Sequence, residues 1–199
     1  MRVVVITPPD PIISLREAAD HLRLGDDLEE FGYVEQLIAS ATEHVDGPSG
    51  WLGRALGLQT LEVRVCGFSD IIRLPYEPII DIVSVHYLDS AGQPQLVDPD
   101  TYELFGRDLG CAWGKSWPTP GVYRGQAETV RIRYRAGYAV DADADPVVQK
   151  VPAPIRSAIL LMVGDLFSFR QTAAFGSGGG AIEMSTTVEN LLSPYRVYN

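Results

Sequence analysis

Residues 129–135 read TVRIRYR, and this stretch decides the fold class. Apolar and basic side chains alternate along it, which is the two-residue period of a β-strand that buries one face. The apolar members are Val130, Ile132 and Tyr134, and the basic members are Arg131, Arg133 and Arg135. Since helical patterns lie on both sides of this stretch in the sequence, we expect the chain to combine helices with an inserted sheet.

Further strand patterns precede it. Residues 60–66, TLEVRVC, alternate in the same way, and the three stretches that follow are rich in β-branched and aromatic residues. These are IIRL at 71–74, IIDIVSVHYL at 79–88 and TYELF at 101–105. Together they predict an antiparallel sheet or small sandwich over residues 57–138.

Helical patterns come before this block. Ser14 and Glu17 form a capping box, in which a hydroxyl caps the first turn of a short helix. A second helix begins at Asp26 or Asp27, and its apolar residues recur at helical spacing as far as Val45.

A helical pattern over residues 151–170, with Pro154 suited to its first turn, follows the block, and residues 188–192 predict one further turn. The predicted class is therefore α+β: N- and C-terminal helices form a small bundle with an inserted antiparallel sheet or sandwich and an extended C-terminal arm. The expected parts are an N-terminal helical part at 1–56, the β insertion at 57–138, a connector and C-terminal helix at 139–175, and the arm at 176–199.

The formal net charge is −10, and residues 1–53 carry −7 of it. Neutralising phosphates requires clustered Lys and Arg, so this composition argues against sequence-independent binding of nucleic acid. No apolar run reaches the roughly 18–20 residues that a membrane span needs, and the N-terminus lacks the pattern of a signal peptide. We therefore expect a soluble cytoplasmic protein without membrane contact.

Residues with catalytic potential are scattered. His21, His44 and His86 belong to no metal-binding or catalytic pattern, and the sequence contains no GxSxG nucleophile motif. Cys66 and Cys111 fit neither a metal site nor a disulfide framework, so we expect two buried free thiols. The sequence thus predicts no catalytic residue, no metal site, no cofactor and no enzymatic activity.

Two polar segments are typical of linkers. DADAD at 141–145 lacks the glycine and the glutamate that a calcium loop of the EF-hand type requires. GSGGG at 176–180 is not followed by a lysine and a hydroxyl residue, which favours a flexible tether over a phosphate-binding loop.

The basic face of residues 129–135 has two interpretations. Arg131, Arg133 and Arg135 either lie on an exposed sheet face with acidic partners on neighbouring strands, or contact another subunit. The charge of the acidic N-terminal region is complementary to such a basic face.

The chain ends in LLSPYRVYN, which is apolar for a terminus. Chain ends are usually polar and poorly ordered unless something holds them. The candidate contact residues are Leu191, Leu192, Tyr195, Arg196, Val197 and Tyr198. They either pack back on the chain's own body or dock in a groove of a partner.

In their order, these motifs resemble the head–tail connector, or adaptor, proteins of long-tailed bacteriophages and of phage-derived gene transfer agents. The stretches that carry the resemblance are SLREAADHLRL, DDLEEFGYVEQLIASATEHVDGPSGWLGRAL, IIRLPYEPIIDIVSVHYLDSAGQPQLVDPDTYEL, TVRIRYRAGYA, VPAPIRSAILLMVGDLFSFR and LLSPYRV. They cover nearly the whole chain.

The resemblance implies a structural subunit of the virion neck, present in the bacterial host cytoplasm during assembly. Such subunits form a ring, usually twelvefold, below the portal. The ring extends the channel through which double-stranded DNA passes as cargo, and it docks the stopper or tail proteins. The C-terminal arm would contact the portal or a neighbouring subunit. An acidic face at Asp26, Asp27, Glu29 and Glu30 would line the lumen or a lateral wall.

Two alternatives stay open. One is a stopper or tail-completion protein of the neck, which a map of the contacts within the neck would distinguish. The other is a small ligand-binding protein or enzyme, which would need a deep pocket with converging polar groups.

Overall fold

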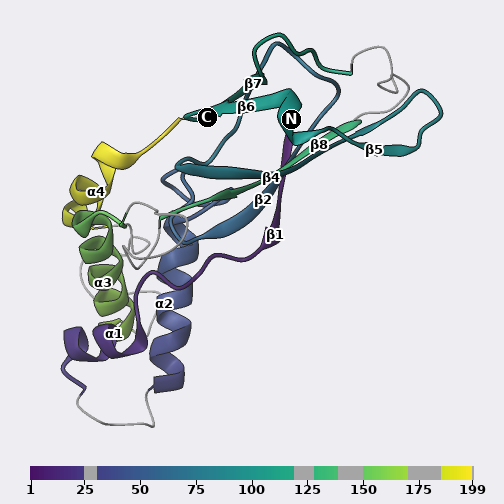
Figure 1. Cartoon of the computed structure of the whole chain (residues 1–199). Helices are drawn as coiled ribbons and strands as arrows, with labels where there is room; N and C mark the ends of the chain where they lie inside the picture. The colour runs from purple at the N-terminus through teal and green to yellow at the C-terminus, as the bar shows by residue number, and fades with distance from the viewer. Residues whose placement is uncertain (25–30, 119–127, 139–149, 170–184, 199) are drawn as a thin grey trace, which may run out of the picture. The chain divides into compact units, whose positions relative to one another are not determined.

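The computed structural model describes residues 1–24, 31–118, 128–138, 150–169 and 185–198. The chain forms two compact units. Unit 1 comprises Met1–Asp10 and Arg54–Gln149, and unit 2 comprises Pro11–Gly53 and Lys150–Asn199. Within the described ranges the strands belong to unit 1 and the α-helices to unit 2, which confirms the α+β class (Figure 1).

Unit 1 contains a five-stranded antiparallel sheet. Its strand order is β1 (Arg2–Thr7), β2 (Gln59–Val65), β8 (Val130–Ala136), β4 (Ile79–Leu88) and β5 (Pro94–Leu96). The stretch TVRIRYR is therefore most of the central strand, hydrogen-bonded to β2 on one side and to β4 on the other. This placement explains its clean alternation, because a central strand must fit a buried and an exposed face along its whole length.

A second antiparallel sheet in unit 1 has three strands. Their order is β3 (Ile71–Arg73), β7 (Asp108–Cys111) and β6 (Tyr102–Phe105), and the 3-10 turn η1 (Pro99–Thr101) leads into β6. The bounds of β3, β4 and β6 agree with the sequence prediction to within a residue. The sequence predicted neither β1 nor β7 as a strand, and β7 is a four-residue strand that contains a glycine.

Both sheets contribute to one hydrophobic cluster. Leu61, Val63 and Ile132 of the larger sheet and Leu109 of the smaller one are fully buried. Fully burying such a side chain contributes about 1.5–3 kcal/mol each. Tyr134 is buried as well, and its phenol donates a hydrogen bond to the Pro75 carbonyl at 2.9 Å. The predicted sandwich core is thus present within unit 1.

The backbone approaches itself closely where β8 ends. Gly137 has a φ of +118°, and a Cβ built there would overlap the Gly57 carbonyl. A Cβ on Gly57 would in turn overlap the Asp10 carbonyl. Only glycine permits these contacts, which bring three distant segments of unit 1 together.

Unit 2 is a helical bundle. It contains α1 (Leu15–Leu22), α2 (Phe31–Val45), α3 (Ala153–Ser168), α4 (Thr186–Leu192) and the 3-10 turn η3 (Ser193–Tyr195). Helix α3 contacts each of the other three α-helices (Figure 1). Apolar side chains of all four are buried, and the largest contributions are Val34, Leu37, Ile38, Ile155, Ile159, Val163 and Leu192.

The start of α1 confirms the hydroxyl half of the predicted capping box, but the Glu17 carboxylate, which such a box directs back to the cap, pairs with α3 instead. The Ser14 hydroxyl accepts a hydrogen bond from the Glu17 amide at 3.2 Å. The Glu17 carboxylate accepts from the Arg156 guanidinium of α3, which also donates to the Ile12 carbonyl at 2.8 Å. A capping residue therefore also ties the first helix of unit 2 to its central one.

Candidate functional site

The C-terminal segment is held by unit 2. The Ser185 hydroxyl caps α4 by accepting from the Val188 amide, and Val188 and Leu192 are fully buried. After η3 the chain runs beside the loop that follows α2, where the Val197 amide donates to the Leu52 carbonyl at 2.8 Å. The predicted helical turn at 188–192 is confirmed and belongs to a seven-residue helix.

An arginine fixes the last described residues. The Arg196 guanidinium lies 4.1 Å from the ring centroid of Trp51 and 4.8 Å from that of Tyr198. Cation–π contacts of this kind are worth about 0.5–1 kcal/mol at exposed sites. They hold the segment on the surface while 82% of Tyr198 stays exposed.

The six predicted contact residues therefore divide in two groups. Leu192 packs within its own unit, which agrees with the interpretation that the segment packs back on the chain's own body. The other five are half-buried or exposed, namely Leu191, Tyr195, Arg196, Val197 and Tyr198. Their contact with a portal or neighbouring subunit stays a prediction. The glycine-rich stretch 176–180 lies outside the described residues.

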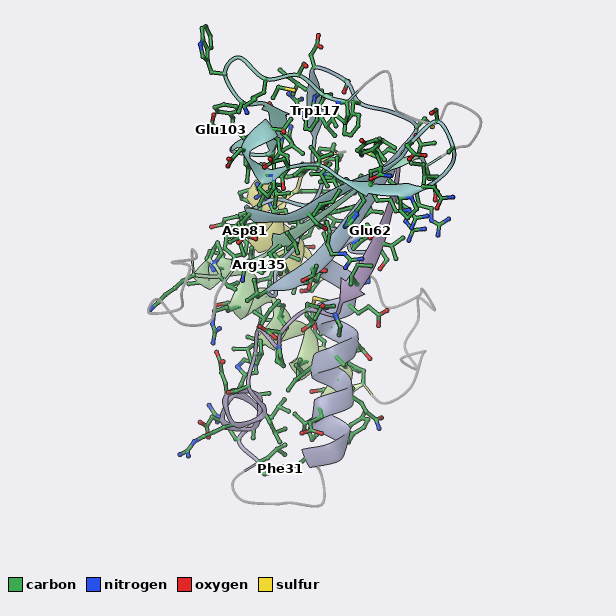
Figure 2. The ribbon with its side chains drawn as sticks, turned by 45° about the vertical axis from the view of Figure 1, so that its right-hand side comes forward. Phe31, Glu62, Asp81, Glu103, Trp117 and Arg135 are labelled. Atoms are coloured by element: carbon green, nitrogen blue, oxygen red, sulfur yellow. The ribbon has the colours of Figure 1, made fainter. Side chains whose placement is uncertain are left out.

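Acidic partners face two of the three predicted arginines. Arg133 of β8 donates to Glu62 of β2 at 2.9 Å, and the two residues are directly opposite in the register. Arg135 makes a two-pronged contact with Asp81 of β4, which Figure 2 shows beside it. Arg131 is exposed, and no residue in the described ranges forms an ion pair with it. The exposed-face interpretation therefore applies to Arg133 and Arg135.

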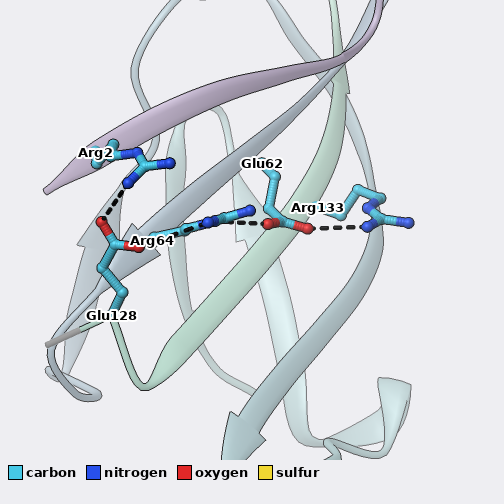
Figure 3. A network of polar contacts seen from close by, with 5 residues as sticks. All are labelled: Arg2, Glu62, Arg64, Glu128 and Arg133. Carbon is cyan, nitrogen blue, oxygen red and sulfur yellow. Dashed lines mark hydrogen bonds and ion pairs between the residues drawn. The ribbon is translucent and has the colours of Figure 1, made fainter. Parts of the chain in front are cut away.

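The pair of Arg133 and Glu62 is part of a longer network (Figure 3). Arg64 donates to Glu62 at 2.8 Å and lies 3.6 Å from Glu128, and Arg2 lies 3.4 Å from the other oxygen of Glu128. Glu62 is the least exposed member. Its burial by itself raises the pKa, but hydrogen bonds and charge from Arg133 and Arg64 outweigh this and hold the pKa of Glu62 below its ordinary value. The carboxylate is thus ionised at neutral pH and ties β2 to β8.

An exposed apolar surface lies on the smaller sheet, and the sequence analysis did not find it. Ile71 of β3 is 62% exposed and Phe105 of β6 is 59% exposed, and both lie on the outer face of their sheet. Trp113, just after β7, is fully exposed. The register places Arg73, Glu103 and Asp108 on the same outer face, so apolar and charged side chains are mixed there.

The remaining candidates do not converge. His21, His44 and His86 are exposed on separate elements, and among the described residues no three potential metal ligands form a cluster. The thiols are free as expected, but the expected burial is wrong for Cys66, which is exposed because it lies beyond the end of β2. Burial raises the pKa of the Cys111 thiol, the more enclosed of the two. The residues Asp26, Asp27, Glu29 and Glu30 and the stretch 141–145 lie outside the described ranges.

No protein-family model matches the sequence, and no curated protein matches it significantly. The fold is similar to three solved chains. The first, from the neck of an empty GTA particle computed with C6 symmetry, has a TM-score of 0.74 and 21% identity. The second, from the virion of a native gene transfer agent (GTA) particle, has a TM-score of 0.68 and 21% sequence identity. The third, from the neck of a native GTA particle computed with C12 symmetry, has a TM-score of 0.69 and 19% sequence identity.

Each alignment covers 100% of this chain and 97% of the other. At these identities the likeness concerns the fold, and it extends over both units. In the described part of the chain, no helix has both the length and the apolar character to cross a bilayer.

Proposed function

We propose that this protein is a non-enzymatic structural subunit of the neck of a phage-like particle. More specifically, it is the adaptor that forms a ring, twelvefold in the simplest case, between the portal and the stopper or tail proteins. Double-stranded DNA would pass through the ring without being bound. The observation that carries the proposal is the full-length similarity of the fold to chains of GTA necks.

The C-terminal segment supports the adaptor over a stopper or tail-completion protein. Its aromatic and apolar residues reach the surface beside a buried anchor, Leu192, so that Tyr195, Val197 and Tyr198 are presented by a folded helix. Presentation from an ordered base lowers the conformational entropy lost on docking. We propose that these residues contact the portal or the neighbouring subunit.

The test is co-sedimentation with the portal protein encoded in the same gene cluster. We would compare the full chain with a chain that ends at Tyr195, which keeps α4 and η3 but lacks residues 196–199. The matched control is Phe169→Ala, which removes an exposed aromatic side chain outside the C-terminal segment. We expect the full chain and the control to bind and the shortened chain to bind at least tenfold more weakly.

Equal binding of all three proteins would place the portal contact elsewhere on the chain. No binding by any of them would contradict the adaptor assignment. Binding to the stopper or tail protein in place of the portal would favour the alternative, a stopper or tail-completion protein.

A further inference from the structure

Four basic residues form one row across the five-stranded sheet. The register pairs Arg2 of β1 with Arg64 of β2, Arg64 with Arg131 of β8, and Arg131 with His86 of β4. Like charges directly opposite one another destabilise a sheet. The row is conspicuous in a chain whose net charge is −10.

Compensation by acidic side chains covers only part of this row. Glu128 contacts Arg2 and Arg64, and Glu62 contacts Arg64 and Arg133. Toward β4 the compensation stops, because no described residue forms an ion pair with Arg131 or with His86, and both are exposed. The β8–β4 end of the row is therefore its uncompensated end.

A hollow of about 200 Å³ lies at this end of the row. Its lining includes His86, Thr129, Arg131 and Arg133, with Glu62 already neutralised by its two arginines. The Nε of Arg133 is buried and has no hydrogen-bond partner among the described residues. This atom is enclosed, so the donors that the hollow can offer to an anion are those of the exposed Arg131 and His86.

We propose that this hollow binds an acidic side chain of residues 11–53 of a second copy of this protein, an inference that rests on the proposed assembly into a ring. A carboxylate fits both the size of the hollow and the planar fork of an arginine donor. The charge is complementary, since residues 1–53 carry −7 and Asp20, Glu35 and Glu43 are exposed on α1 and α2. A contact between two different surfaces of identical copies is the type that closes into a ring.

DNA phosphate is the weaker candidate for the same donors. Protein surfaces that bind nucleic acid present many cationic side chains along the phosphate backbone. The hollow presents two arginines and one histidine beside a carboxylate, within a strongly acidic chain. The observations therefore favour a carboxylate from protein.

The test uses zero-length carbodiimide cross-linking, which joins a carboxylate to an amine in direct contact. The natural chain has two lysines, Lys115 and Lys150, so Arg131→Lys adds an amine against a low background. We would mix ¹⁴N- and ¹⁵N-labelled copies of the full-length variant, assemble them with the portal protein and identify the linked peptides by mass spectrometry. Arg73→Lys is the matched control, because Arg73 lies 3.0 Å from Asp108 of the same copy.

We expect the lysine introduced at position 131 to join an Asp or Glu within residues 11–53 in peptides of mixed isotope. The control should give peptides of a single isotope that join position 73 to Asp108. Arg131→Glu should lower the yield of assembled rings at least tenfold, whereas Arg73→Glu should leave it within twofold.

The proposal is overturned if rings form but position 131 links only within one copy, links to acids outside 11–53, or gives no link. That result would leave the neck assignment intact. Rings that bind DNA through Arg131 would assign the hollow to phosphate instead. Failure of the unmodified chain both to form rings and to bind the portal would overturn the neck assignment and this proposal together.

Discussion

Glu62 is the residue on which the polar face of the larger sheet depends. Its side chain is 6% exposed, yet it is charged, because Arg64 on its own strand and Arg133 on the next strand both donate to it. Removing one partner of a largely buried pair leaves the other without compensation. An uncharged residue at position 62 would therefore leave Arg64 and Arg133 without this carboxylate, so few other residues suit the position.

We expect Glu62→Gln to lower the free energy of unfolding at pH 7 by about 1–3 kcal/mol, since hydrogen bonds to charged groups contribute about that much. Urea unfolding followed by circular dichroism measures it. Asp108→Asn is the control: its partner Arg73 is mostly exposed, so the loss should stay below about 1 kcal/mol.

The interaction of Glu62 with Arg64 and Arg133 also makes the free energy of unfolding depend on pH. The pKa of Glu62 is lowered in the folded state, so its contribution is complete above the ordinary value of 4.5 and is lost as the pH falls through the folded value. The difference between Glu62→Gln and the natural chain should therefore shrink in urea titrations at successively lower pH below 4.5. A difference that grows toward acid pH would contradict the assigned ion pair.

Among the elements, β4 shows how far the sequence pattern reaches. Its bounds follow from the run IIDIVSVHYL, but its pairing does not, because the register with β8 shifts between Ile79 and Asp81 and again between Ile82 and Ser84. The second shift places Asp81 opposite Arg135, where an unbroken register would place Ile82. Alternation predicts which face of β8 is basic, but a bulge on the neighbour decides which acid meets it.

The short strands could not be predicted for a related reason. Residues 3–6 read VVVI without alternation, so nothing local says which strand β1 joins, and β7 has only four residues. Their pairing depends on contacts between segments far apart in the sequence. Helix α1, with its Ser14 cap, and helix α2, with apolar residues at helical spacing, needed no such information.

At the level of α4, the buried side chains of Val188 and Leu192 connect the C-terminal segment to the bundle. We expect Leu192→Ala to lower the free energy of unfolding by about 2–5 kcal/mol, because it leaves a cavity under the helix. Leu191→Ala, at the half-buried neighbouring position, should have a clearly smaller effect. Urea unfolding of the two variants makes the comparison. Equal losses would mean that α4 is not anchored through Leu192.

The charge of the whole molecule leads to a prediction about DNA. At physiological salt and about 10 µM protein we expect no retardation of duplex DNA in a gel, since binding without sequence preference needs clustered cations. A salt-sensitive shift that Arg131→Glu abolishes would contradict this and assign the basic row to phosphate. If the chain forms the proposed ring, its net charge of −10 per subunit would let DNA slide past without adhering.

The stacking of Arg196 on Trp51 has a practical consequence. The indole ring lies under a guanidinium that belongs to the last residues of the chain, so its intrinsic fluorescence depends on whether those residues stay in place. Replacing the fully exposed Trp113 with phenylalanine would remove a solvent-exposed background emitter. The chain thus carries an unlabelled optical reporter, with which the moment of docking could be timed in a stopped-flow instrument.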